Sequence, residues 1–208
     1  MIYSFLQNGD SAITIQFENK ISEEVNRRVT GLCNTIEAKG INGVIELVPT
    51  FASLTVFYDC TIISSKRLKK KIKALINDGE RSVKSKAIVW NIPVCYDDEF
   101  ALDMENVCNH TSLEKEEVIR LHTSKPYLIY MLGFLPGFAY LGGMDERLFT
   151  PRLKTPRLEI FEGAVGIGSE QTGIYPIASP GGWQLIGKTP VKVFDKSKES
   201  PILYKAGD

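Results

Sequence analysis

Glycine and proline are concentrated in one part of this 208-residue chain, and their distribution limits the folds that it can adopt. Eleven of the 17 glycines and six of the ten prolines lie between residues 133 and 190. Both residue types interrupt regular elements and favour tight turns, so long helices are excluded from this segment. The apolar stretches between the turns are short and lie at 158–161, 164–167, 184–186 and 191–194. Short strands between closely spaced turns are typical of an irregular β-barrel.

The first half of the chain has a different pattern, in which strand and helix signals alternate. Apolar and polar residues alternate in the strand candidates, and the helix candidates show apolar residues at helical spacing. Ser22 is a suitable N-cap and Gly40 a suitable C-terminal stop for the first helix. The clearest predicted elements are strands at 13–17, 44–48 and 54–58 and helices at 22–40 and 68–78. We infer the order β-β-α-β-β-α, which is typical of two helices packed on one face of an antiparallel sheet.

The two patterns together predict an α+β fold with two domains. Residues 1–84 are expected to form the small N-terminal α/β sandwich, and residues 85–208 the β-barrel. One helix is predicted to interrupt the second domain, with Thr111 or Ser112 as its cap and Leu121 near its end.

The charge of the chain argues against a general nucleic-acid binder. Twenty-five basic and 25 acidic residues give a net charge of zero, whereas binding by counterion release requires an excess of Lys and Arg. Within the neutral total, residues 64–86 carry a net charge of +7 and residues 97–117 a net charge of −7. We expect both segments to be solvated surfaces, with the docking of an anionic partner by the basic helix as the alternative.

No targeting or membrane segment is expected. The N-terminus lacks a basic region followed by an apolar stretch, so no signal peptide is predicted. The longest apolar run, at 127–141, is interrupted by glycine and proline and is shorter than the roughly 18 residues of a membrane span. We therefore expect a cytoplasmic protein with no membrane partner.

Cysteine and histidine usage predicts neither a disulfide framework nor a metal site. The four cysteines are widely spaced, with no C-x-x-C pair, and are expected to be small buried hydrophobes; they are Cys33, Cys60, Cys95 and Cys108. With only two histidines, a zinc site is not expected. His122 follows a helical apolar pattern, so we expect it at a surface or cap position rather than in catalysis.

Most catalytic signatures are absent from the sequence. There is no G-x-x-x-x-G-K-[ST] phosphate loop and no G-x-S-x-G nucleophile motif. The segment Gly166-Ile167-Gly168 lacks the third glycine of a dinucleotide fingerprint. The residues alone therefore do not indicate a complete enzyme, and they identify no catalytic residue.

The glycine- and proline-rich segment nevertheless carries groups that could form a binding site. Arg152 and Arg157 each follow a proline, and guanidinium groups make bidentate contacts with carboxylates. We expect a pocket for a small planar amide or carboxylate. The candidate substrate-binding residues are Arg152, Arg157, Gln171, Tyr175, Phe134, Phe138 and Tyr140. In the alternative interpretation the glycines and prolines only form turns, while Phe134, Phe138 and Trp183 fill the barrel.

The motifs of this segment resemble those of one protein family. They are G-F-x-P-G-F-x-Y at 133–140, P-R at 151–152 and 156–157, Q-T-G-I-Y-P at 171–176 and S-P-G-G-W at 179–183. Over essentially its whole length the chain is similar to the family of the 5-oxoprolinase B subunit, the kinase inhibitor KipI and allophanate hydrolase subunit 1. This resemblance implies a small α+β N-terminal domain followed by a cyclophilin-like β-barrel.

The resemblance also implies an activity that requires partners. Together with the A and C subunits of 5-oxoprolinase, the B subunit opens 5-oxo-L-proline to L-glutamate with hydrolysis of ATP. ATP is not expected to bind tightly to this chain alone. The alternative is a protein-contact inhibitor of a sporulation sensor histidine kinase, and a cyclophilin-type prolyl isomerase ranks last. Arg152, Arg157 and Gln171 favour the enzyme, because a contact inhibitor needs only an exposed apolar surface.

Overall fold

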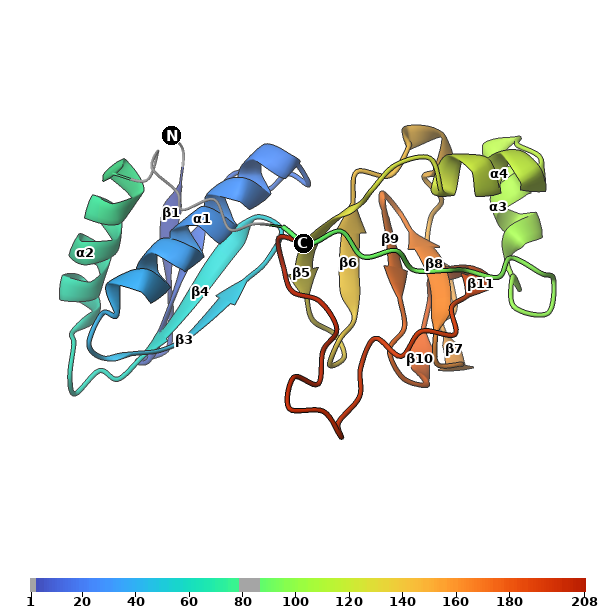
Figure 1. The fold of residues 1–208 in the computed structure, drawn as a ribbon. Helices are drawn as coiled ribbons and strands as arrows, with labels where there is room; N and C mark the ends of the chain where they lie inside the picture. Colours follow the sequence, from blue (N-terminus) through green and yellow to red (C-terminus); the bar gives the residue numbers. More distant parts are fainter. Residues whose placement is uncertain (1–2, 79–86) are drawn as a thin grey trace. The chain divides into compact units, whose positions relative to one another are not determined.

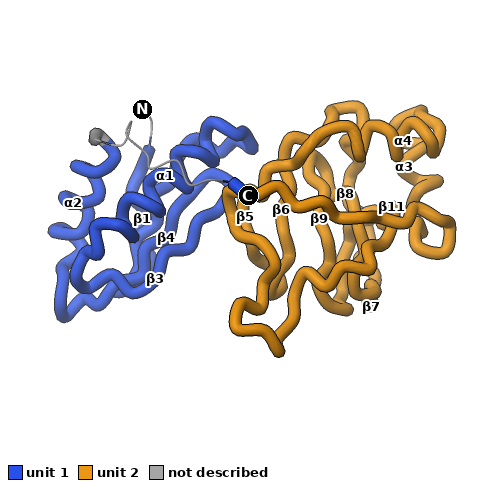
Figure 2. The backbone as a smooth tube through the Cα atoms, in the orientation of Figure 1, with its two compact units in different colours: residues 1–87 blue, residues 88–208 orange. Residues whose placement is uncertain are grey.

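The computed structural model of the chain describes residues 3–78 and 87–208 (Figure 1). The chain divides into two compact units, Met1–Ala87 and Ile88–Asp208 (Figure 2). The predicted domain boundary, between residues 84 and 85, lies outside the described residues. In the described ranges, none of the helices is both long enough and apolar enough to cross a membrane.

The described part of the N-terminal unit, residues 3–78, contains a four-stranded antiparallel sheet and two helices (Figure 1). Its elements are β1 (Ser4–Asn8), β2 (Ala12–Gln16), α1 (Glu23–Lys39), β3 (Val44–Pro49), β4 (Ser53–Tyr58) and α2 (Ser65–Asp78). The strand order in the sheet is β1-β2-β4-β3. The predicted order β-β-α-β-β-α is therefore confirmed.

Local signals explain the helices of this unit. The Ser22 side chain accepts a hydrogen bond from the Val25 backbone N–H, and Gly40 ends α1 in the left-handed conformation with φ 52°. In α2, Leu68 and Ile72 are fully buried against the core that β2 and β4 share with α1. The basic residues of α2 are mostly exposed, as expected for a solvated face.

The C-terminal unit contains a five-stranded antiparallel sheet with the order β11-β8-β9-β6-β5 and a separate two-stranded sheet, β10-β7. Its elements are α3 (Met104–Thr111), α4 (Lys115–His122), β5 (Leu128–Leu132), β6 (Ala139–Gly142), η2 (Glu146–Leu148), β7 (Arg157–Ile160), β8 (Ala164–Gly168), β9 (Gln171–Ile174), β10 (Ser179–Gly181) and β11 (Gln184–Lys188). The α+β class is confirmed. The described strands do not close into the predicted barrel, because β5 and β11 remain the two edges of the larger sheet.

The helix prediction for this unit needs a correction. Two helices are present instead of one, and Thr111 and Ser112 end α3 rather than begin α4. Ser112 is the C-cap of α3 in the left-handed conformation with φ 57°. The residue that precedes α4 is Glu114, whose side chain makes no capping hydrogen bond. The serine and threonine hydroxyls suggested an N-cap, but the same residue types also occur where helices end.

The two faces of the five-stranded sheet carry different residues. Successive residues of a strand point to opposite faces. Tyr140 on β6 pairs with Gly173 on β9, and Leu141 pairs with Thr172. We call the face of Tyr140 and Gly173 the aromatic face, and the face of Leu141 and Thr172 the cavity face.

Candidate functional site

Phe138 is the centre of a cluster of five aromatic rings on the aromatic face. Its ring centroid lies 4.9 Å from that of Tyr140, 5.0 Å from that of Tyr175 and 5.3 Å from that of Trp183. The ring of Phe134 lies 5.6 Å away from it. All four pairs are T-shaped, which is a favourable geometry for aromatic rings. The structure therefore brings together the four aromatic residues predicted for the site.

Glycines provide the space that Trp183 occupies. A Cβ atom on Gly168 would lie 2.4 Å from Cε2 of the indole, and one on Gly173 would lie 2.9 Å from Cζ3. β8 therefore requires glycine at position 168 and β9 at position 173, because a side chain at either position would collide with the indole ring. The Arg152 guanidinium lies over the same indole, with its Cζ 5.5 Å from the ring centroid.

Phe134 differs from the other aromatic residues of the cluster. Its side chain is 60% exposed, and its backbone has φ 64°, in the left-handed region that bulky residues rarely adopt. Phe138 and Trp183 are almost completely buried. The expectation that aromatic residues fill the interior is therefore correct for Phe138 and Trp183 and wrong for Phe134. A strained, exposed aromatic residue is typical of a functional surface.

Arg157 and Arg152 have different partners. Its guanidinium forms a bidentate ion pair with Asp103, with N–O distances of 2.6 and 2.8 Å. The Asp103 carboxylate also accepts a hydrogen bond from the Leu185 backbone N–H at 2.7 Å. Asp103 is only 2% exposed, so this member of the acidic segment is buried rather than solvated. The ion pair and the Leu185 hydrogen bond connect the start of α3 with β7 and β11, so Arg157 stabilises the packing of these elements.

Gln171 and the two tyrosines supply the polar groups of the aromatic face. Gln171 is buried, and its Nε2 has no hydrogen-bond partner among the described residues. Burial raises the pKa of the Tyr140 and Tyr175 hydroxyls, while the positive charge of Arg152 acts in the opposite direction on both. Arg152 is therefore within electrostatic range of both hydroxyls. The pairing of Gln171 with Gly168 places its side chain on the same face as Tyr140.

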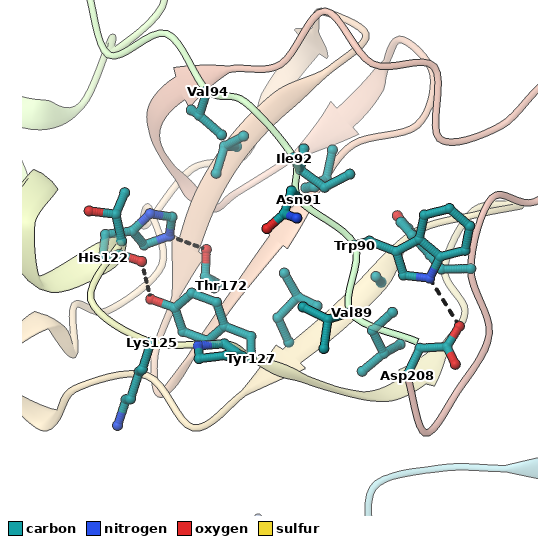
Figure 3. Close-up of a pocket in the computed structure, with 18 of the residues that line it drawn as sticks. Val89, Trp90, Asn91, Ile92, Val94, His122, Lys125, Tyr127, Thr172 and Asp208 are labelled. Carbon is teal, nitrogen blue, oxygen red and sulfur yellow. Dashed lines mark hydrogen bonds between the residues drawn. The ribbon is translucent and has the colours of Figure 1, made fainter. Parts of the chain in front are cut away.

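A cavity of about 600 Å³ lies on the cavity face of the same sheet (Figure 3). The sheet contributes Ile129, Ala139, Leu141, Val165, Thr172 and Ile174. The extended segment 88–94 and the turn at 123–127 contribute most of the remaining lining. Figure 3 shows Asn91, Ile92 and Val89 between the His122 end and the Trp90–Asp208 end of the cavity.

His122 lies at one end of this cavity, and the expectation of a surface or cap position is wrong. It is buried, and this burial lowers its pKa to about 4, so the imidazole is neutral near pH 7. Thr172 donates its hydroxyl hydrogen to the Gly166 carbonyl, so it accepts from Nε2–H of His122 at 2.8 Å. The other ring nitrogen, Nδ1, consequently accepts from the Tyr96 hydroxyl at 2.7 Å. No local sequence pattern indicates this network, because its members are 26 and 50 residues apart.

The cysteines are less buried than predicted. All four are free; Cys60 is exposed and the other three are half-buried. Cys60 lies two residues after the end of β4. Within residues 3–78 and 87–208 there is no group of three or more His, Cys, Asp or Glu side chains placed to hold a metal ion.

Comparison with known proteins identifies the family. The chain is 44% identical to the 5-oxoprolinase B subunit of Bacillus subtilis, over 99% of this chain and 90% of that protein. It is 37% identical to the 5-oxoprolinase B subunit of Haemophilus influenzae, over 96% of this chain and 92% of that protein. The crystal structure of TTHA0988 superposes with a TM-score of 0.82 at 35% identity. That match covers 95% of this chain but only 38% of the TTHA0988 chain. Residues 3–204 match the carboxyltransferase domain, subdomain C and D, and the chain belongs to this family.

Proposed function

We propose that this chain is the B subunit of an ATP-dependent 5-oxoprolinase, which opens 5-oxo-L-proline to L-glutamate together with the A and C subunits. The observation that carries this proposal is the similarity to proteins named as the B subunit of 5-oxoprolinase, which extends over 96–99% of the chain. The aromatic face supports it further. It combines an exposed guanidinium, a phenol and an amide beside a cluster of aromatic rings, which suits a small planar amide that carries a carboxylate.

The reaction requires activation of a stable amide. Resonance stabilises the C–N bond of the lactam, and the strain of a five-membered ring is too small to open it. Phosphorylation of the carbonyl oxygen would make the carbonyl carbon a better electrophile, which accounts for the use of ATP. We assign the binding of ATP to the partner subunits. We assign the binding and orientation of the lactam to this chain. The sequence contains no phosphate loop, in agreement with this division.

In this proposal Arg152 binds the carboxylate of the substrate. Its guanidinium is exposed, and its position over the Trp183 indole restricts its orientation. The Tyr140 phenol, whose pKa is raised by burial, can donate a hydrogen bond to the lactam carbonyl. Gln171 supplies the unpaired amide of the same face. Arg157 supports the site through Asp103 instead of contacting substrate.

A partner subunit is proposed to complete the pocket. Phe134 and Arg152 are both exposed at the edge of the aromatic cluster. Aromatic residues and arginines are both enriched in the energetically important part of protein interfaces. A subunit that covers these two residues would exclude water from a substrate bound at the aromatic cluster.

Reconstitution with the purified A and C subunits tests the proposal. We expect ATP-dependent glutamate release only when all three subunits are mixed, and none from this chain alone. In the reconstituted complex, Arg152→Ala should lower kcat/KM by about ten- to a hundredfold, because one charge-assisted hydrogen bond contributes roughly 1.5–3 kcal/mol. Lys154→Ala is the matched control, because Lys154 is also exposed and lies two residues away.

Two results would contradict different parts of the proposal. Glutamate release by the chain alone would refute the requirement for partners. An unimpaired Arg152→Ala complex would refute the assignment of the substrate site but not the subunit identity. Inhibition of a sensor histidine kinase stays a prediction, which autophosphorylation of a purified kinase with and without this chain would test.

A further inference from the structure

The cavity on the cavity face is separate from the proposed substrate site. Thr172 and Ile174 of β9 line it, whereas Gly173 lies on the aromatic face. Because neighbouring residues of a strand point to opposite faces, the sheet itself separates the cavity from the aromatic cluster. An inference about the cavity therefore does not depend on the proposed function.

The size and lining of the cavity favour a small apolar occupant. Its volume, about 600 Å³, falls within the roughly 300–1,000 Å³ that is typical of small-molecule sites. The sheet side is apolar apart from Thr172. On the other side, Ile88, Val89 and Trp90 line the cavity while remaining 50%, 68% and 37% exposed. Covering these side chains would remove apolar surface from water, which is favourable.

The hydrogen bonds around the cavity determine which polar group an occupant can carry. The hydroxyl hydrogen of Tyr96 is donated to His122 Nδ1, and that of Tyr127 to the His122 carbonyl oxygen at 2.6 Å. The Trp90 indole N–H is donated to Asp208 at 3.1 Å (Figure 3). These donors are therefore committed, but each phenol oxygen retains a free lone pair. A ligand that donates a hydrogen bond can use these oxygens.

The charges around the cavity favour an uncharged ligand. His122 is neutral near pH 7. Asp208 accepts hydrogen bonds from the Ile88 N–H and the Trp90 indole, so its charge is already stabilised. Lys125 is exposed, and Figure 3 shows its side chain pointing away from the other lining residues. A buried carboxylate or ammonium of a ligand would therefore lose its hydration without gaining a dedicated partner.

We infer that this cavity binds an uncharged, mostly apolar small molecule that donates a hydrogen bond to the hydroxyl oxygen of Tyr96 or Tyr127. The occupant is a small molecule rather than a segment of a partner protein, because the hydrogen-bonding oxygens lie beside His122, at the end of a cavity of small-molecule size.

Three related probes test the inference by isothermal titration calorimetry at pH 7. They are 2-naphthol, which donates a hydrogen bond, 2-methoxynaphthalene, which cannot donate one, and 2-naphthoate, which is charged. We expect 2-naphthol to bind with a Kd below about 1 mM. Methylation of its oxygen should weaken binding by about tenfold, because the donor is lost, and the carboxylate should weaken it further.

Substitutions locate the binding site. Leu141→Trp and, as a second variant on the covering segment, Ile92→Trp fill the cavity and should abolish 2-naphthol binding. Leu158→Trp is the control, because Leu158 is 91% exposed on β7 and does not line the cavity. Tyr96→Phe or Tyr127→Phe should remove the preference for 2-naphthol over 2-methoxynaphthalene. Thermal unfolding of each variant shows whether it is folded.

The following results would overturn the inference. One is equal affinity for all three probes, and another is unchanged 2-naphthol binding in both folded cavity-filling variants. A third is the absence of binding by any probe at about 1 mM. If no probe binds and Ile92→Trp blocks assembly with the A and C subunits, the cavity is an interface with a partner protein and not a small-molecule site.

Discussion

Arg157 and Asp103 form a bidentate ion pair in which the carboxylate is almost completely buried and also accepts the Leu185 backbone N–H. The pair joins residues 54 positions apart in the sequence. Arg157 therefore holds the start of α3 against the strands of the aromatic face. Its role in the proposed activity is to position the site, whereas Arg152 remains exposed to a ligand.

The first prediction is that Arg157→Ala destabilises the fold. Removing the guanidinium leaves the Asp103 carboxylate buried without its charged partner, which typically costs about 3–5 kcal/mol. Chemical denaturation of the isolated chain measures this cost. The double variant Asp103→Asn with Arg157→Ala should lose less stability than the two single changes added together. Strict additivity would contradict the coupling.

The sequence and the structure agree where local signals determine the outcome. The Ser22 cap, the Gly40 stop and the alternation in β4 each act within a few residues, and all three predicted the N-terminal unit correctly. Arg152 and Arg157 show the limit of such signals. Both follow a proline in the sequence, and only the distant Asp103 distinguishes the ion-paired arginine from the exposed one.

The open edges of the five-stranded sheet and the burial of His122 could not be predicted for the same reason. Turn density predicts short strands, but whether the outer strands β5 and β11 pair depends on their positions in space. His122 has a helical apolar pattern, which is equally compatible with a surface or a buried position. Its partners, Tyr96 and Thr172, come from other parts of the chain.

The second prediction concerns the glycines under Trp183. Gly168→Ala should destabilise the C-terminal unit by about 1–3 kcal/mol, because the new Cβ would lie 2.4 Å from the indole and the ring must move. The melting temperature of the variant measures this effect. Gly182→Ala is the control, because its Cβ would meet no atom closer than 3.6 Å. Equal melting temperatures for the two variants would refute the packing of the indole against Gly168.

The third prediction is a loss of stability at acidic pH that depends on His122. The pKa of this histidine is about 4 in the folded protein and 6.5 without the effect of burial. Above pH 6.5 both states are neutral at this residue. As the pH falls from 6.5 to 4, the unfolded chain binds the proton and the folded chain does not, so stability decreases by about 3 kcal/mol.

A His122→Gln variant separates this effect from the titration of carboxylates. The glutamine amide can accept from Tyr96 and donate to Thr172 but does not titrate. Denaturant unfolding at pH 7 and pH 4.5 should therefore show a smaller difference for the variant than for the wild type. An identical pH dependence of the two proteins would mean that His122 is not buried in its neutral form.

The fourth prediction tests the strain at Phe134. Phe134→Ala and Phe134→Gly remove the same ring and the same T-shaped contacts with Phe138 and Tyr175. Alanine retains a Cβ atom at φ 64°, where an L-residue costs about 1–2 kcal/mol, whereas glycine adopts this conformation freely. The glycine variant should therefore be more stable than the alanine variant by about 1 kcal/mol, as measured by thermal unfolding.

Both variants should reduce the activity of the reconstituted complex, because the exposed Phe134 ring that a partner would cover is gone. Equal stability of the two variants would show that the backbone at this position is not strained, and full activity of both would show that the ring has no role in assembly.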